Sequence, residues 1–131
     1  MQSKTDTKTA TQTLSRLRQD LRRLVVELDG SIEAVFGRGP LVKGTVYEMA
    51  RKCGKPSCAC TRGELHRSTV LSWSHKGKTR LMSIPPERLA ELRGKSEEYQ
   101  RLRGARAEVA TIGKKMLAVI DKIEQIRREE P

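Results

Sequence analysis

The cysteines of this 131-residue chain all lie in one short segment, Cys53-Gly-Lys-Pro-Ser-Cys58-Ala-Cys60, and one of its two histidines follows at His66. Three thiolates and an imidazole are the ligand set of a closed, tetrahedral zinc site. Their spacing is not that of a zinc finger, so the prediction depends on clustering and on ligand type. We expect a structural Zn²⁺ held by Cys53, Cys58, Cys60 and His66.

Other interpretations of these cysteines remain open. They could be reduced thiols in a turn-rich loop, or two of them could form a disulfide while the third stays an unpaired thiol. A bridge between Cys58 and Cys60 would close a small, strained ring. The fourth zinc ligand could also be His75, Glu64 or a water molecule instead of His66.

The segment Lys52-Cys-Gly-Lys-Pro-Ser-Cys-Ala-Cys60, with Gly63-Glu-Leu-His66 and Gly77-Lys-Thr-Arg80 after it, resembles a family of small basic prokaryotic proteins classed as a domain of unknown function. The resemblance covers about residues 41 to 100. It singles out the same four candidate zinc ligands and implies a gene near a mobile element. It implies no activity.

The charge of the chain is strongly positive and unevenly distributed. It carries 27 lysines and arginines against 16 aspartates and glutamates, and residues 36–83 hold 10 of the basic side chains but only 2 of the acidic ones. Such a surface favours a polyanionic partner over a small-molecule substrate. We expect nucleic acid, DNA before RNA, to contact the basic side chains of the cysteine loop and of a following hairpin: Lys55, Arg62, Lys76, Lys78 and Arg80.

The first part of the chain has the pattern of a helix with a partner. Five leucines are spaced 3, 4, 3 and 4 residues apart, which is typical of a coiled-coil seam, and Val25 widens it. We expect a helical arm over residues 13–36, begun at Thr13 and interrupted at Gly30, after a disordered tail over residues 1–12. The seam should bind another chain or the C-terminal helix through Leu14, Leu17, Leu21, Leu24 and Leu28.

Residues 41–84 lose the helical period and gain β-branched residues, which predicts strands at 45–51, 68–74 and 79–84. Gly77 can take a positive φ in the turn between the second and third strands. Three short strands cannot bury enough apolar surface by themselves, so we expect a metal to stabilise this antiparallel unit.

A helical pattern returns at Pro85-Pro86 and continues through residues 85–130. Gly94, Gly104 and Gly113 each weaken a helix by about 1 kcal/mol relative to alanine, so one bent helix or two helices are expected. The fold class is therefore α+β, a small zinc-stapled antiparallel unit between coiled-coil-like helical arms.

These features favour a cytoplasmic, nucleic-acid-binding accessory protein whose arms bind a second copy or another protein. The alternative is an interaction adaptor of a larger enzyme complex of a mobile element or defence system, without nucleic-acid contact. An enzyme is not expected, because paired carboxylates, a Ser/His/Asp set and a phosphate-binding glycine loop are all missing. No apolar run reaches the roughly 18 residues of a membrane span.

Overall fold

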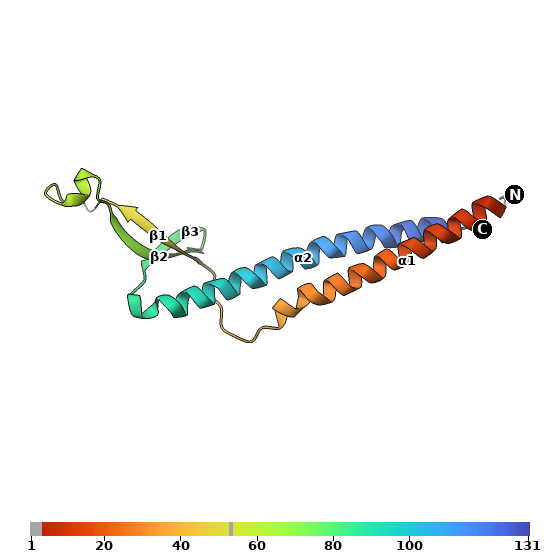
Figure 1. Cartoon of the computed structure of the whole chain (residues 1–131), viewed down its shortest axis with the longest axis horizontal. Coiled ribbons are helices and arrows are strands. Elements are labelled where there is room, and N and C mark those ends of the chain that lie inside the picture. The colour runs from red at the N-terminus through yellow and green to blue at the C-terminus, as the bar shows by residue number, and fades with distance from the viewer. Residues whose placement is uncertain (1–3, 53) are drawn as a thin grey trace. The chain divides into compact units, whose positions relative to one another are not determined.

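The computed structural model describes residues 4–52 and 54–131, with the backbone alone for residues 4–7, 60 and 61. Along these residues the chain forms an α+β protein with two long helices and a three-stranded antiparallel sheet, so the predicted fold class is confirmed at that level (Figure 1). The elements, in order, are α1 (Lys4–Ile32), a 3₁₀ turn (Glu33–Phe36), β1 (Thr45–Arg51), η2 (Ala59–Arg62), β2 (His66–His75), β3 (Lys78–Ser83), η3 (Pro86–Arg88) and α2 (Leu89–Arg127).

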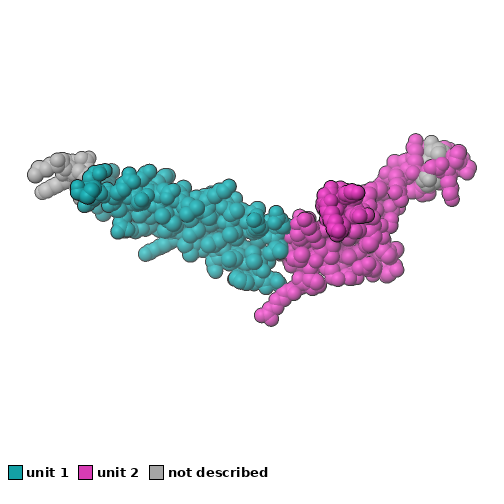
Figure 2. All heavy atoms as spheres, turned by 180° about the vertical axis from the view of Figure 1, so that it is seen from behind, with its two compact units in different colours: residues 1–37, 102–131 teal, residues 38–101 magenta. Residues whose placement is uncertain are grey.

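The chain divides into two compact units (Figure 2). One unit contains α1 and Leu102–Pro131, and the other is Arg38–Arg101, which contains the sheet and the first turns of α2. Helix α2 therefore contributes residues to both units.

The sheet has the order β1-β2-β3, and its strands match the predicted ones to within two residues. Lys76 and Gly77, with φ values of 52° and 78°, form the turn between β2 and β3. Two successive positive φ angles define the type I′ turn, whose twist matches that of paired strands. The predicted role of Gly77 is confirmed.

The face of the sheet that packs against α2 forms the core of this unit. Leu71 lies opposite Val46 on β1 and Met82 on β3, and successive residues of a strand point to opposite faces, so these three side chains share one face. Leu71, Ile84 and Leu92 are buried together there, with Trp73 and Leu89 partly buried against them. The apolar surface that the three strands lack is thus supplied by the start of α2.

The segment before β1 is fixed to α2 by two hydrogen bonds. The Val42 amide donates to the Lys95 carbonyl at 3.1 Å, and the buried Ser96 hydroxyl donates to the Gly44 carbonyl at 2.6 Å. Gly44 is buried, and a Cβ at this position would lie 2.9 Å from Leu71 Cδ1 and 2.9 Å from the Ser72 carbonyl oxygen. Only glycine fits this approach without displacing the central strand.

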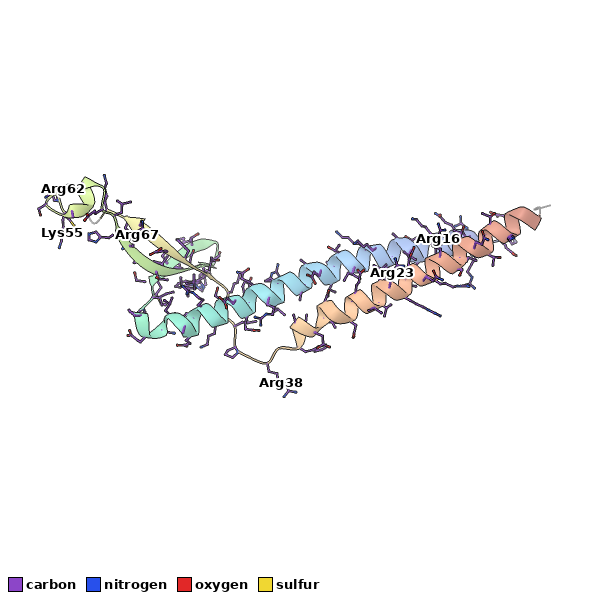
Figure 3. The ribbon with its side chains drawn as sticks, in the orientation of Figure 1. Arg16, Arg23, Arg38, Lys55, Arg62 and Arg67 are labelled. Atoms are coloured by element: carbon purple, nitrogen blue, oxygen red, sulfur yellow. The ribbon has the colours of Figure 1, made fainter. Side chains whose placement is uncertain are left out.

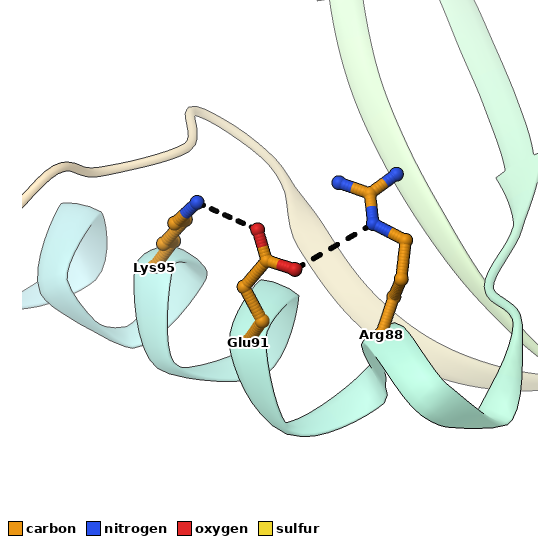
Figure 4. Close-up of polar contacts among 3 residues, drawn as sticks. All are labelled: Arg88, Glu91 and Lys95. Atoms are coloured by element: carbon orange, nitrogen blue, oxygen red, sulfur yellow. Dashed lines mark hydrogen bonds and ion pairs between the residues drawn. The ribbon is translucent and has the colours of Figure 1, made fainter.

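Helix α2 begins with a chain of ion pairs on its exposed side (Figure 4). Glu91 Oε1 accepts from Lys95 Nζ at 2.7 Å, and Glu91 Oε2 lies 3.6 Å from Arg88 Nε. The hydrogen bond from Lys95 and the two positive charges lower the pKa of the Glu91 carboxyl from its ordinary value. Glu91 therefore stays ionised to a lower pH than an isolated glutamate, at the positive end of the α2 dipole.

In the other unit, α1 and the second half of α2 lie side by side and run antiparallel (Figure 1). The Ser31 hydroxyl donates to Glu108 Oε2 at 2.8 Å, and Leu17, Ala105 and Ile112 are buried. The other seam leucines, at 14, 21, 24 and 28, are half-buried. Val25 was expected to widen the seam, but it is exposed and so lies outside the contact.

Two details of the helices differ from the expectations, and the C-terminal arm adopts one of its two expected forms. Residues 4–12 belong to α1 rather than to a tail, because the half-buried Ala10 extends the apolar stripe of Leu14 and Leu17, and elongating an existing helix costs little. Helix α1 passes through Gly30 to Ile32, where the Ser31–Glu108 hydrogen bond holds its last turn. Helix α2 is one continuous helix, since burial along it offsets the cost of its glycines.

We predict that Gly44→Ala lowers the free energy of unfolding by about 1–3 kcal/mol, because the added methyl meets backbone that cannot yield. Urea unfolding followed by the fluorescence of Trp73, the single tryptophan, measures this loss. Gly39→Ala is the matched control, since a Cβ there meets nothing within 4 Å. Equal stability of the two variants would show that the approach of Gly44 to β2 is not required.

Candidate metal and nucleic-acid site

The loop between β1 and β2 carries the cysteines. It leaves the sheet after Arg51 and returns at His66, and these two residues are paired in the strand register, so the ends of the loop are neighbours. Gly54 and Gly63 have φ values of 84° and 105°, a conformation that favours glycine. The Cys58 amide donates to the Lys55 carbonyl at 3.1 Å and closes a turn just before η2. The glycines and this turn direct the loop back toward the strand ends.

The loop places Cys58 beside His66. Cys58 Sγ lies 3.1 Å from His66 Nε2. Two such ligands on one tetrahedral zinc would lie about 3.6 Å apart, given bonds of about 2.3 Å to sulfur and about 2.1 Å to nitrogen. The two atoms thus lie about 0.5 Å closer than a shared Zn²⁺ requires, so they are in direct contact and a small separation would admit the metal.

The other histidine lies far from the cysteine loop. His75 is at the opposite end of β2, where it pairs with Lys78. A ten-residue strand spans about 30 Å at about 3.3 Å per residue, so His75 cannot share a metal with Cys58. Of the two histidines, only His66 has the position of a ligand.

The complete zinc set stays a prediction. Cys53 lies outside the described residues, and so does the side chain of Cys60. Among the side chains that are described, no three metal-binding groups come together. Cys58 and His66 are the two predicted ligands whose side chains are described, and the structure brings them together.

The five predicted nucleic-acid contacts are all exposed, but the structure separates them into two groups. Lys55 and Arg62 lie on the loop, near Arg67 (Figure 3). Lys76, Lys78 and Arg80 lie at the hairpin, the other end of the ten-residue β2. The ten-residue β2 separates the predicted loop contacts from the predicted hairpin contacts by about 30 Å.

A polar hollow of about 430 Å³ lies next to the loop, and its lining was not anticipated from the sequence. It is lined by Arg51, Lys52, His66, Ser68 and Ser83. Lysine and arginine are always donors at neutral pH, and serine hydroxyls also donate, so the lining suits an anion. Strand alternation could have indicated the two serines, but only once the register of all three strands was known.

Comparison with known proteins gives a family and nothing more specific. The family described as "Domain of unknown function (DUF6788)" matches residues 12–94. No curated protein and no solved structure matches the chain. Neither helix, over its described length, is long and apolar enough to cross a membrane.

Metal analysis of protein purified without chelator tests the cysteine loop. We predict one zinc per chain, because thiolates in a cysteine-rich loop beside His66 form a closed site. His66→Ala should lower the retained zinc, whereas the matched variant His75→Ala should not, since His75 is at the far end of β2. Protein that contains no zinc yet keeps its sheet, as seen by circular dichroism, would contradict this prediction.

Proposed function

The chain belongs to the DUF6788 family, whose function is unknown, and we propose from its own residues that it is a nucleic-acid-binding accessory protein. A structural Zn²⁺ held by Cys53, Cys58, Cys60 and His66 fixes the β1–β2 loop, and the basic side chains beside it bind phosphates. DNA is the first ligand to test. The contact between Cys58 and His66 at the base of a basic loop is the observation that carries this proposal.

The charge around the loop supports phosphate binding even with the metal in place. Residues 51–67 contain five lysines and arginines and one carboxylate, Glu64, which gives +4. Three thiolates and one Zn²⁺ together contribute −1 and leave +3. A loop that holds zinc therefore remains attractive to a polyanion.

The cations of the loop are available to a ligand. Lys55 and Arg62 are exposed, and neither forms an ion pair within the described part of the chain. Arg67 lies 3.9 Å from Glu48, but both side chains are largely exposed, so this pair contributes little. Phosphates would bind at the loop without first breaking a strong internal interaction.

A second function, a protein-interaction adaptor, is favoured by the surface of the helical unit. Val26 and Leu117 expose 72% and 62% of their surface, and Val25 and Ile120 are also exposed. Apolar side chains on both helices are suited to contact with another protein, such as a subunit of a larger mobile-element or defence complex. In this alternative, nucleic acid would not be contacted directly.

Salt dependence of binding separates the two functions. Five phosphate contacts predict a slope of log K against log salt of about −4.5 on B-DNA, at about −0.9 per contact. Lys55→Gln with Arg62→Gln should flatten the slope by about 1.8, and neutralising Lys76, Lys78 and Arg80 should flatten it by about 2.7. Fluorescence anisotropy with a labelled duplex and a labelled single strand measures both slopes.

The matched control neutralises two exposed arginines of α1, Arg16 and Arg22, which lie in the other unit and should leave the slope unchanged. Zinc content and helicity should stay the same in every variant. A parent protein that binds neither oligonucleotide at low salt, or loop and hairpin variants with the parent slope, would leave the adaptor function as the better explanation.

A further inference from the structure

The face of the sheet opposite α2 has an apolar centre with an exposed aromatic ring. Tyr47 lies opposite Val70, and Leu81 lies opposite the next residue on that face, Ser72. Val70 is only 4% exposed, whereas Tyr47 and Leu81 keep 39% and 51% of their surface exposed. We call this surface, formed by Tyr47, Val70 and Leu81, the outer face.

The polar hollow belongs to the same side of the sheet. His66 and Ser68 are four and two residues before Val70 on β2, so they share its side, as do Arg51 and Ser83 through their strand partners. Arg51 is four residues after Tyr47 on β1, which is about 13 Å at about 3.3 Å per residue. A flat aromatic ring and a group of hydrogen-bond donors thus lie in line along one surface.

We propose that the outer face binds single-stranded nucleic acid, with an unpaired base stacked on Tyr47 beside Leu81 and a neighbouring phosphate bound in the hollow by Arg51, Lys52 and Ser68. The proposal rests on the proposed function and names the form of nucleic acid that this surface accepts. It gives the basic hollow and the exposed ring one shared ligand.

The chemistry of this surface selects a single strand over a duplex and over an apolar peptide. In a duplex the faces of the bases are stacked on one another, so a ring on a sheet can stack only on an unpaired base. The hollow presents two cations and two hydroxyls, a set of donors that matches phosphate oxygens better than an apolar peptide.

The test compares a short oligothymidylate with an abasic strand of the same length, which keeps the phosphates but lacks the bases. The parent should bind oligothymidylate about tenfold more tightly, given the usual contribution of base stacking on an aromatic side chain. Tyr47→Leu should remove this difference, and Tyr47→Phe, which keeps the ring, should retain it. Phe36→Leu is the matched control, because Phe36 is an exposed aromatic residue in the other unit.

Arg51→Gln examines the phosphate end of the same surface. It should weaken binding to both strands by similar factors. For each strand it should flatten the slope of log K against log salt by about 0.7, the value for one contact on a single strand. If the variant keeps the parent's slope on both strands, the hollow does not bind phosphate. Thermal melting confirms that each variant is folded.

Equal affinity of the parent for the two strands would overturn the proposal, and this comparison needs no variant. Salt-sensitive binding to duplex, or to both strands equally, would still support the proposed function. Absence of binding to any oligonucleotide at low salt would overturn both. A base-dependent affinity that Tyr47→Leu abolishes, with the Phe36→Leu control unchanged, would establish a single-strand site on the outer face.

Discussion

The buried cluster of Leu71 from the central strand, Ile84 and Leu92 of α2 is the packing on which the sheet unit depends. All three residues are buried, whereas most other side chains of the strands are exposed or half-buried. Three short strands have little core of their own, and packing against a helix is one of the ways in which such a sheet becomes stable. The hydrogen bond from Ser96 to the Gly44 carbonyl holds β1 at the same helix, so the absence of a side chain at Gly44 serves the same packing.

This packing also determines which surfaces are open to a ligand. Because α2 packs on one face of the sheet, Tyr47, Leu81 and the polar hollow lie on the other. Because β2 has ten residues, the cysteine loop and the β2–β3 hairpin lie at opposite ends of the sheet. A ligand that contacts both basic groups must therefore follow the length of β2, as an extended nucleic-acid strand does.

Much of the fold could be predicted because its signals are local. The strand at Thr45–Arg51, the turn at Gly77 and the helix start after Pro85 each follow from residues within a few positions of one another. The sequence left one helix and two helices as equal alternatives for the C-terminal arm, since the cost of its glycines is offset by burial against residues distant in sequence.

The candidate site was predictable only in part for the same reason. Clustering in sequence indicated that Cys58 and His66 act together, and their side chains are adjacent. Lys55 was predicted on the loop and Lys76 at the hairpin, but only the length of β2 shows how far apart these two groups lie. The serines of the hollow lie near Arg51 because of the strand register. This register cannot be predicted from a local pattern of the sequence.

The most direct test of a zinc-held, phosphate-binding loop is the affinity for a single-stranded oligonucleotide at low salt, measured before and after zinc is removed. Chelator-treated protein should bind more weakly, because the loop that positions Lys55 and Arg62 loses its metal, and one equivalent of Zn²⁺ should restore the affinity. The Lys55→Gln, Arg62→Gln variant should respond less to zinc than the parent does. Equal affinity of the parent with and without zinc, while its metal content changes, would contradict the proposed role of the metal.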